Sequence, residues 1–167
     1  MLSIPKRVKP HVRYLAYLLC HKWHVAYAGV RLGVPLWRLL IHDWTKFTRA
    51  EWGPYVRRFF GGRGSLMDKS ADPQEFHDAW RHHYERNPHH PEYWRQPEED
   101  GTLRANWMPP TYVREMIADW YGAGMAQGKP DIEGWYIANK DRLSLHPGSR
   151  FVATQVLKEA QRKRLIP

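Results

Sequence analysis

The stretch "VRYLAYLLCHKWHVAYAGV", residues 12–30, sets the fold class, because its apolar side chains follow the period of a helix. Spacings near three and four residues place such side chains on one helical face. The positions with this spacing are Leu15, Leu18, Leu19, Val25 and Val30. Long period-two alternation, internal repeats and low-complexity runs are absent from the sequence. The pattern therefore predicts an all-α protein.

Helix-start signals divide the remainder of the chain. Gly33 and Pro35 interrupt the first pattern, and "LWRLLIHDWTKF", residues 36–47, resumes it as a second helix. Two capping-box sequences, residues 48–51 and 72–75, predict further helix starts. The helix that opens at the second box should end near Asn87, because proline disfavours helix in the residue before it.

Three more helices are expected in the second half of the chain, over residues 110–128, 131–143 and 148–164. The glycine-rich residues 59–72 should form a flexible loop. Residues 88–110, with five prolines, should form an irregular connection, and connections of that length tend to be functional. We expect one domain over residues 1–167, built from about six to seven helices.

Composition narrows the class of partner. The 167 residues carry a formal net charge of +9, which favours an anionic partner such as a nucleic acid or a phosphorylated small molecule. The single cysteine, Cys20, permits no internal disulfide and fits the reducing cytoplasm. It also leaves any metal ion to histidine and carboxylate ligands. No apolar run is long enough to span a membrane, so we expect a cytoplasmic protein without a membrane partner.

The most informative motif is "LLIHDWTKF", residues 39–47. His42 and Asp43 are adjacent at the end of an apolar helix, and burial of an ionised carboxylate is unfavourable without a compensating cation or hydrogen bonds. Imidazole and carboxylate suit a borderline divalent metal. Lys46, one turn further, should face the same cavity and bind a phosphate oxygen. The alternative is a helix-capping aspartate beside a surface histidine.

Two other helices carry candidate ligands. His21 and His24 lie three residues apart on the first helix, and we assign His24 to its apolar face. Glu115 and Asp119 lie four residues apart in "REMIADW", so they share a helical face. Like charges at that spacing repel, which favours a metal ion or an arginine between them over an exposed acidic pair.

The segment "RHHYERNPHHPEYW", residues 81–94, is unusually rich in histidine. His83 and Asn87 should share a helical face, and His89 and His90 follow the end of that helix, where the chain can fold back toward the same site. The interleaved aromatic residues favour a packed pocket wall over a solvated histidine tract. His82, His89, His90 and Asn87 are therefore candidates for a second metal ion or for substrate contacts.

The order of these motifs resembles the HD superfamily of metal-dependent phosphohydrolases, whose pattern is His, then His-Asp, then a distal Asp. "LLIHDWTK" is similar to the LLHD-x-x-K helix of that superfamily. Over nearly the whole chain the sequence also resembles a small family of uncharacterised bacterial and phage proteins. The segments that carry this second resemblance are "HDWTKF", "HYERNPHHPEYW", "MPPTYVREMIADW", "WY" at 135–136 and "LHP" at 145–147.

The HD resemblance implies an HD-like helical fold and a metal-dependent phosphohydrolase, found in a bacterial cell or encoded by a phage. The histidine segment lacks the spacing and the Gly-Tyr-Pro signature of the two-metal phosphodiesterases, so the resemblance implies one divalent ion (Mn, Fe, Co, Zn or Ni), with a second as an option. The implied metal ligands are His24, His42, Asp43 and Asp119.

The same resemblance suggests roles around that ion. Lys46, Glu115 and His83 would act in catalysis on a nucleotide or related phosphoester. The residues assigned to substrate binding are Arg81 and Arg86 for phosphate, and Tyr84, Trp94 and Trp120 for stacking on a base. The alternative is a non-catalytic nucleotide- or nucleic-acid-binding protein with a degenerate HD-like site.

Overall fold

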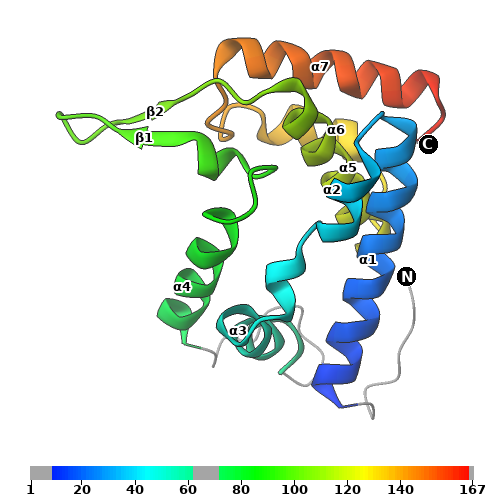
Figure 1. Ribbon diagram of the computed structural model, residues 1–167, viewed down its shortest axis with the longest axis vertical. Helices are drawn as coiled ribbons and strands as arrows, with labels where there is room; N and C mark the ends of the chain where they lie inside the picture. Colours follow the sequence, from blue (N-terminus) through cyan, green and yellow to red (C-terminus); the bar gives the residue numbers. More distant parts are fainter. Residues whose placement is uncertain (1–8, 62–71, 166–167) are drawn as a thin grey trace.

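The computed structural model describes residues 9–61 and 72–165. This part of the chain is mostly helical, as predicted, with one small antiparallel hairpin (Figure 1). The elements in chain order are α1 (Pro10–Arg31), α2 (Leu36–Ile41), the 3-10 helix η1 (Trp44–Phe47), α3 (Arg49–Phe60), α4 (Pro73–Tyr84), the 3-10 helix η2 (Pro91–Trp94), β1 (Arg95–Pro97), β2 (Leu103–Ala105), α5 (Pro110–Gln127), α6 (Ile132–Asn139) and α7 (Pro147–Arg162).

The second expected helix is interrupted, and the prediction that it continues through residue 47 is wrong. α2 ends at Ile41, His42 has non-helical backbone angles (φ −49°, ψ 128°), and Asp43 adopts the left-handed conformation with φ 56°. The 3-10 helix η1 begins only after this turn. Aspartate is one of the few residues besides glycine that tolerates a left-handed conformation. The break turns the His42–Asp43 pair away from the path of α2.

Of the two predicted capping boxes, only the one that begins at Asp72 has a first residue whose side chain caps its helix. The Asp72 side chain accepts a hydrogen bond from the backbone N–H of Gln74, with Pro73 at the first helical position of α4. Thr48 does precede α3, but its hydroxyl donates to the carbonyl of Thr45 and does not cap the helix. Glu51, the acidic member of that box, points elsewhere.

The connection at residues 88–110 is more regular than expected. It holds the 3-10 helix η2 and then β1 and β2, which pair with Arg95 opposite Ala105. The predicted flexible loop at residues 59–72 is helical at its first two residues, and its central part, residues 62–71, lies outside the described residues. α4 ends at Tyr84, slightly before the predicted position.

Two apolar clusters meet along α1. The larger one joins α1 to α5 and α7, and the smaller one joins α1 to α3 and α4. Gly122 lets α5 approach α1 closely, because a Cβ atom there would lie 2.4 Å from a methyl carbon of Val25 and 2.9 Å from the carbonyl oxygen of His21. His21 therefore sits on α1 between Leu18 of the smaller cluster and Val25 of the larger. None of the described helices combines the length and apolarity needed to cross a bilayer.

Candidate metal centre

Six segments of the chain bring imidazole and carboxylate groups together between the two apolar clusters. They are α1, the turn after α2, α3, α4, the turn after α4, and α5. The residues they contribute are almost fully buried: His21, His42, Asp43, Glu51, His83, His89, Glu115 and Asp119. Burial of so many titratable groups is unfavourable unless each finds a partner, so the partners define what the site can do.

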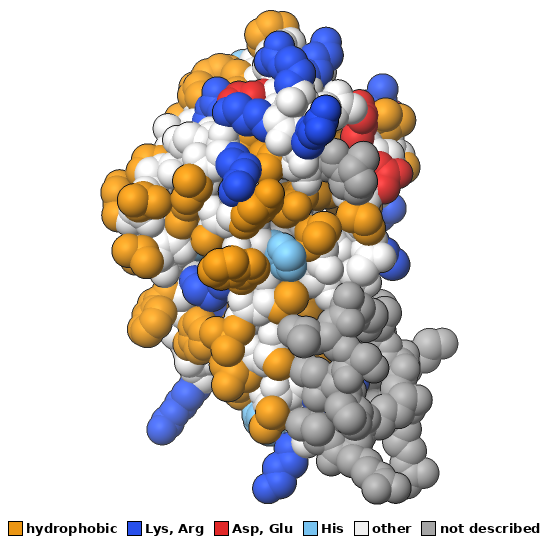
Figure 2. All heavy atoms as spheres, turned by 90° about the vertical axis from the view of Figure 1, so that its right-hand side faces the viewer, with side chains coloured by type: hydrophobic (Ala, Val, Ile, Leu, Met, Phe, Trp, Pro, Cys, Tyr) orange, Lys and Arg blue, Asp and Glu red, His pale blue; other side chains and the backbone are white. Residues whose placement is uncertain are grey.

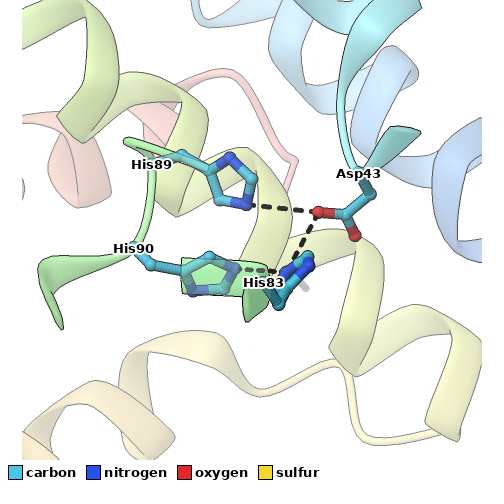
Figure 3. A group of neighbouring side chains, drawn as sticks. All are labelled: Asp43, His83, His89 and His90. Atoms are coloured by element: carbon cyan, nitrogen blue, oxygen red, sulfur yellow. Dashed lines mark hydrogen bonds and ion pairs between the residues drawn. The ribbon is translucent and has the colours of Figure 1, made fainter. Parts of the chain in front are cut away.

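Asp43 lies at the centre, and its two carboxylate oxygens face different histidines. Oδ1 lies 3.4 Å from Nε2 of His83 and 3.4 Å from Nε2 of His89. Figure 3 marks both contacts with dashed lines. Oδ2 lies 3.3 Å from Nε2 of His21 and 3.6 Å from Nε2 of His42. One fully buried carboxylate therefore joins two sets of imidazoles, and the left-handed turn at this residue points it inward.

The first donor group contains His21, His42, Asp43 and Asp119. Asp119 Oδ1 lies 3.1 Å from His21 Nε2 and 3.4 Å from His42 Nε2. The four ligand atoms all lie within 4.8 Å of one another. Two imidazoles and two carboxylates at this separation match the donor types that bind first-row divalent metals.

The second donor group contains Asp43, His83, His89 and His90, again with all ligand atoms within 4.8 Å. His83 Nε2 and His90 Nε2 are 2.8 Å apart, and Figure 3 shows His83 and His89 facing the Asp43 carboxylate while His90 faces His83. A third, overlapping set joins His42, His89 and Glu115. The centre can thus hold one ion in either of two places, or two ions that share Asp43.

Buried glutamates orient the imidazoles from outside. Glu115 on α5 contacts Nδ1 of His42 at 3.1 Å and Nδ1 of His89 at 3.4 Å. Glu51 on α3 contacts Nδ1 of His83 at 2.8 Å. In each case the opposite nitrogen, Nε2, faces the centre. A carboxylate that receives one imidazole N–H fixes the tautomer and leaves the other nitrogen free for a metal ion.

Four atoms at the centre have no hydrogen-bond partner among the described residues: His21 Nδ1, His42 Nε2, Asp43 Oδ1 and His89 Nε2. A buried polar atom without a partner is destabilising by roughly 1–3 kcal/mol. The last three of these atoms face the donor groups, His42 Nε2 in the first, His89 Nε2 in the second and Asp43 Oδ1 in the second through its contacts with His83 and His89. Divalent ions bound in the two groups would satisfy these three atoms, so the donor sets fit such ions.

The electrostatics of the centre follow from the same contacts. Burial opposes ionisation of Asp43, but His42 and Lys46 beside it outweigh burial and hold the pKa of this carboxyl well below its usual range. Lys46 Nζ lies 2.5 Å from Asp43 Oδ2, and despite burial this carboxylate raises the pKa of the lysine. Burial and the neighbouring histidines lower the pKa of His90, which keeps this imidazole neutral, as a metal ligand must be.

A pocket of about 730 Å³ opens onto the donor groups. Its lining includes buried donor-site residues, namely His42, His89 and Glu115. It also includes the exposed side chains of Leu40, Ile41 and Trp44. A volume of this size accommodates a small-molecule ligand.

A family model described as "Family of unknown function (DUF5662)" matches residues 11–160. The chain belongs to the DUF5662 family. No curated protein and no solved structure matches the sequence significantly.

In this DUF5662 protein, α1 contributes His21 and not His24, which corrects the ligand expected from the sequence. His24 is only partly buried, and its ring lies edge-on to that of Tyr121, 6.3 Å between centroids. The buried face of α1 comprises Tyr14, Leu18, His21, Val25 and Ala28. That stripe has helical spacing, but the exposed face has a similar apolar stripe, so the sequence would identify His21 only if Tyr14 were already known to be in the core.

The other predicted ligands and catalytic residues lie at the centre, although not always in the expected role. His42, Asp43 and Asp119 come together as expected, and so do His83, His89 and His90. The Lys46 ammonium pairs with Asp43. Glu115 accepts the Nε–H of Arg38 at 2.7 Å and contacts imidazole Nδ1 atoms, so it supports ligands.

Two further candidates sit beside the second donor group. The Asn87 amide donates to the carbonyl of His83 at 2.7 Å and to the Thr45 hydroxyl at 2.8 Å, so it holds the end of α4. His82 is partly exposed, and its Nδ1 contacts Glu51 at 2.7 Å, outside the donor groups. Glu51 itself was missed as a site residue, because its spacing from Thr48 gave it an adequate explanation as a helix cap.

The residues assigned to substrate binding are dispersed. Arg86 lines the pocket, whereas Arg81 is exposed and pairs with Asp78. Tyr84 packs on Trp80, outside the pocket lining. Trp94 donates to the carbonyl of Pro88 and packs on Tyr112, and Trp120 packs on Trp135 and Tyr136 of α6. Of the five, Arg86 alone is part of this pocket's lining.

Proposed function

We propose that this DUF5662 protein is a metal-dependent phosphohydrolase that acts on a nucleotide or a related phosphoester. The observation that carries the proposal is the central Asp43 carboxylate, whose two oxygens each face a separate set of histidine Nε2 atoms. The order His21, His42–Asp43, Asp119 also retains the His, His-Asp, distal Asp pattern of the HD superfamily, with His21 in place of His24.

His21, His42, Asp43 and Asp119 would hold one divalent ion, and the same Asp43 with the three histidines of the second group would hold another. When bound, such ions supply Lewis-acid activation of water and of a phosphoryl oxygen at neutral pH. Glu115 and Glu51 orient the imidazoles from behind. In hydrolysis the water oxygen forms a bond to phosphorus, the ester P–O bond breaks, and the departing oxygen takes a proton.

Charged side chains of the chain support an anionic substrate. Arg86 lines the pocket, and about half of its side chain is exposed, so its guanidinium can meet phosphate oxygens there. Arg38 also lines the pocket, but Glu115 already holds its guanidinium. Lys46 keeps a positive charge beside Asp43, which offsets part of the negative charge that a phosphate would bring.

The test begins with metal content. The purified protein should retain about one to two divalent ions per chain by elemental analysis, and the His42→Ala/Asp43→Ala variant should lose them. A matched control, His24→Ala/Asp78→Ala, removes the same residue types from outside the donor groups and should retain the metal. Equal metal content in both variants would contradict the assignment.

Activity is tested separately, with nucleoside mono-, di-, tri- and cyclic phosphates and a generic aryl phosphodiester. Metal-dependent release of phosphate or of the aryl alcohol is expected from the wild type and not from the double variant. Retained metal without turnover of any substrate would instead favour the alternative, a nucleotide- or nucleic-acid-binding protein. The formal charge of +9 is the observation in favour of that alternative.

A further inference from the structure

The outward face of α1 is apolar, although α1 already buries its opposite face. The exposed apolar side chains on this helix recur at helical spacing: Val12, Leu15, Leu19, Trp23, Tyr27 and Val30. The buried stripe, which includes Leu18 and Val25, occupies the other side of the helix. A surface helix of a globular protein normally places polar residues opposite its core-facing stripe. This second stripe therefore needs a separate explanation.

α2 and η1 extend the same apolar surface. Leu36, Trp37, Leu40, Ile41 and Trp44 are all more than half exposed, and Leu40 reaches 77 %. α2 lies against α1, because the Lys22 ammonium donates to the carbonyls of Leu40 and His42 and a Cβ at Gly29 would meet the Leu39 side chain. Figure 2 shows hydrophobic side chains gathered across this face of the molecule, with Lys and Arg side chains at its edges. Contiguous exposed apolar surface of this kind marks an interaction site.

Acidic side chains are nearly missing from the first 67 residues of the sequence. That part of the chain contains 12 of the 26 Lys and Arg residues and 2 of the 17 Asp and Glu residues. The two acids are Asp43 and Glu51, and both are fully buried. The described parts of α1, α2, η1 and α3 thus present exposed apolar and basic side chains without an exposed carboxylate.

We propose that this face, formed by α1, α2 and η1, docks on an anionic phospholipid surface. Exposed tryptophans, here Trp23, Trp37 and Trp44, suit the boundary between headgroups and acyl chains. Large aliphatic side chains can enter that boundary while basic side chains meet anionic headgroups. The sequence-based expectation of no membrane partner rested only on the lack of a membrane-spanning segment. A face that docks on the membrane surface does not require such a segment.

Other occupants fit the face less well. In a symmetric dimer the same patch meets itself, so its basic side chains would face basic side chains of the second copy. A nucleic acid would satisfy the basic side chains but would cover exposed leucines such as Leu19 and Leu36 with charged phosphates and sugars. Leu40, Ile41 and Trp44 belong both to this face and to the pocket lining, so docking would bring the pocket close to the lipid surface.

The test is flotation of the full-length protein with vesicles, in chelator, so that it does not depend on metal binding or hydrolysis. Vesicles of phosphatidylcholine with phosphatidylglycerol should carry the protein, vesicles of phosphatidylcholine alone should carry much less, and added salt should weaken binding. The variant Trp23→Ser/Leu36→Ser/Trp37→Ser changes exposed residues outside the pocket lining. It should bind anionic vesicles about tenfold or more weakly, because its apolar contact is lost.

A matched control carries the same kind of change on other exposed apolar residues, Leu103→Ser/Ile137→Ser/Phe151→Ser. It should bind as the wild type does. Three results would overturn the proposal: a wild type that does not float, equal binding to neutral and anionic vesicles, or unchanged binding by the first variant. A fourth overturning result could come from light scattering. If the wild type were a dimer and the variant Trp23→Ser/Leu36→Ser/Trp37→Ser a monomer, the occupant of this face would be a second copy of the chain.

Discussion

Replacement of Glu51 by glutamine should weaken the binding of one of the two metal ions proposed above and leave the binding of the other nearly unchanged. Glu51 is fully buried on α3, and its two carboxylate oxygens contact Nδ1 of His82 and Nδ1 of His83, at 2.7 and 2.8 Å. Only His83 belongs to a donor group, the one shared with His89 and His90. The first group, around His21, receives no contact from Glu51.

The size of the effect follows from the role of the carboxylate. Glutamine keeps the volume of Glu51 and one acceptor oxygen, but it has no charge with which to raise the basicity of the His83 imidazole. Loss of such an outer partner lowers metal affinity about 10- to 100-fold, or roughly 1.4–2.7 kcal/mol. If both groups bind an ion in the wild type, the stoichiometry at limiting free metal should therefore fall from two ions to one, through selective loss of the ion in the second donor group.

Calorimetric titration of the metal-free protein with Mn²⁺ or Zn²⁺ measures both affinities in one experiment. Glu75→Gln is the matched control, because Glu75 also pairs with a cationic side chain, Arg57, but lies on the exposed side of α4. The control should titrate as the wild type does. Equal weakening of both ions by the change at Glu51, or no weakening at all, would refute the assignment of this glutamate to the second donor group.

Four further outcomes are expected. Asp43→Asn should abolish binding of both ions and, by leaving the buried Lys46 ammonium without its carboxylate, lower the free energy of unfolding by about 3–5 kcal/mol in denaturant titrations. His21→Ala should reduce bound metal whereas His24→Ala should not, as judged by elemental analysis. Gly122→Ala should destabilise the protein by about 1–3 kcal/mol, because its Cβ would lie 2.9 Å from the His21 carbonyl. Burial lowers the pKa of His21, but the carboxylates of Asp119 and Asp43 outweigh burial and raise this pKa above its ordinary value of 6.5. The stability that the protonated form gives the metal-free protein is therefore present below pH about 6.5 and is lost as pH rises through the higher folded-state pKa. The increase in Tm on adding metal should accordingly be larger at pH about 8 than at pH about 6.

The helices could be predicted because apolar periodicity and proline and glycine signals act locally. The buried face of α1 could not, because both of its faces are apolar. Of the five residues that defined the pattern in the sequence, Leu15, Leu19 and Val30 are exposed, whereas Leu18 and Val25 are in the core. A rotation of the helix by half a turn is invisible to periodicity when the two stripes are similar. The wrong choice of histidine on α1 has the same origin.

The interruption of the helix at His42 and Asp43 also could not be predicted from the local sequence pattern. Residues 36–47 are favourable for a continuous helix, and nothing nearby requires a left-handed residue. The turn is explained by the tertiary structure, which surrounds Asp43 with histidines from α1, α4 and the turn after α4. Residues that depart from local preference in this way often belong to functional sites.

The balance of buried charge links these observations to the proposed metal ions. Four carboxylates are buried around the centre, those of Asp43, Glu51, Glu115 and Asp119, and two permanent cations, Lys46 and Arg38, contact them. Negative charge therefore exceeds fixed positive charge, and an uncompensated buried charge is strongly unfavourable. Without metal, the remaining compensation must come from protons on the imidazoles, and the carboxylates do raise the pKa of His21, His42 and His89 despite burial. Divalent ions would replace those protons at the same nitrogens. The geometry of the donor atoms and the excess of buried negative charge thus both favour a bound divalent cation.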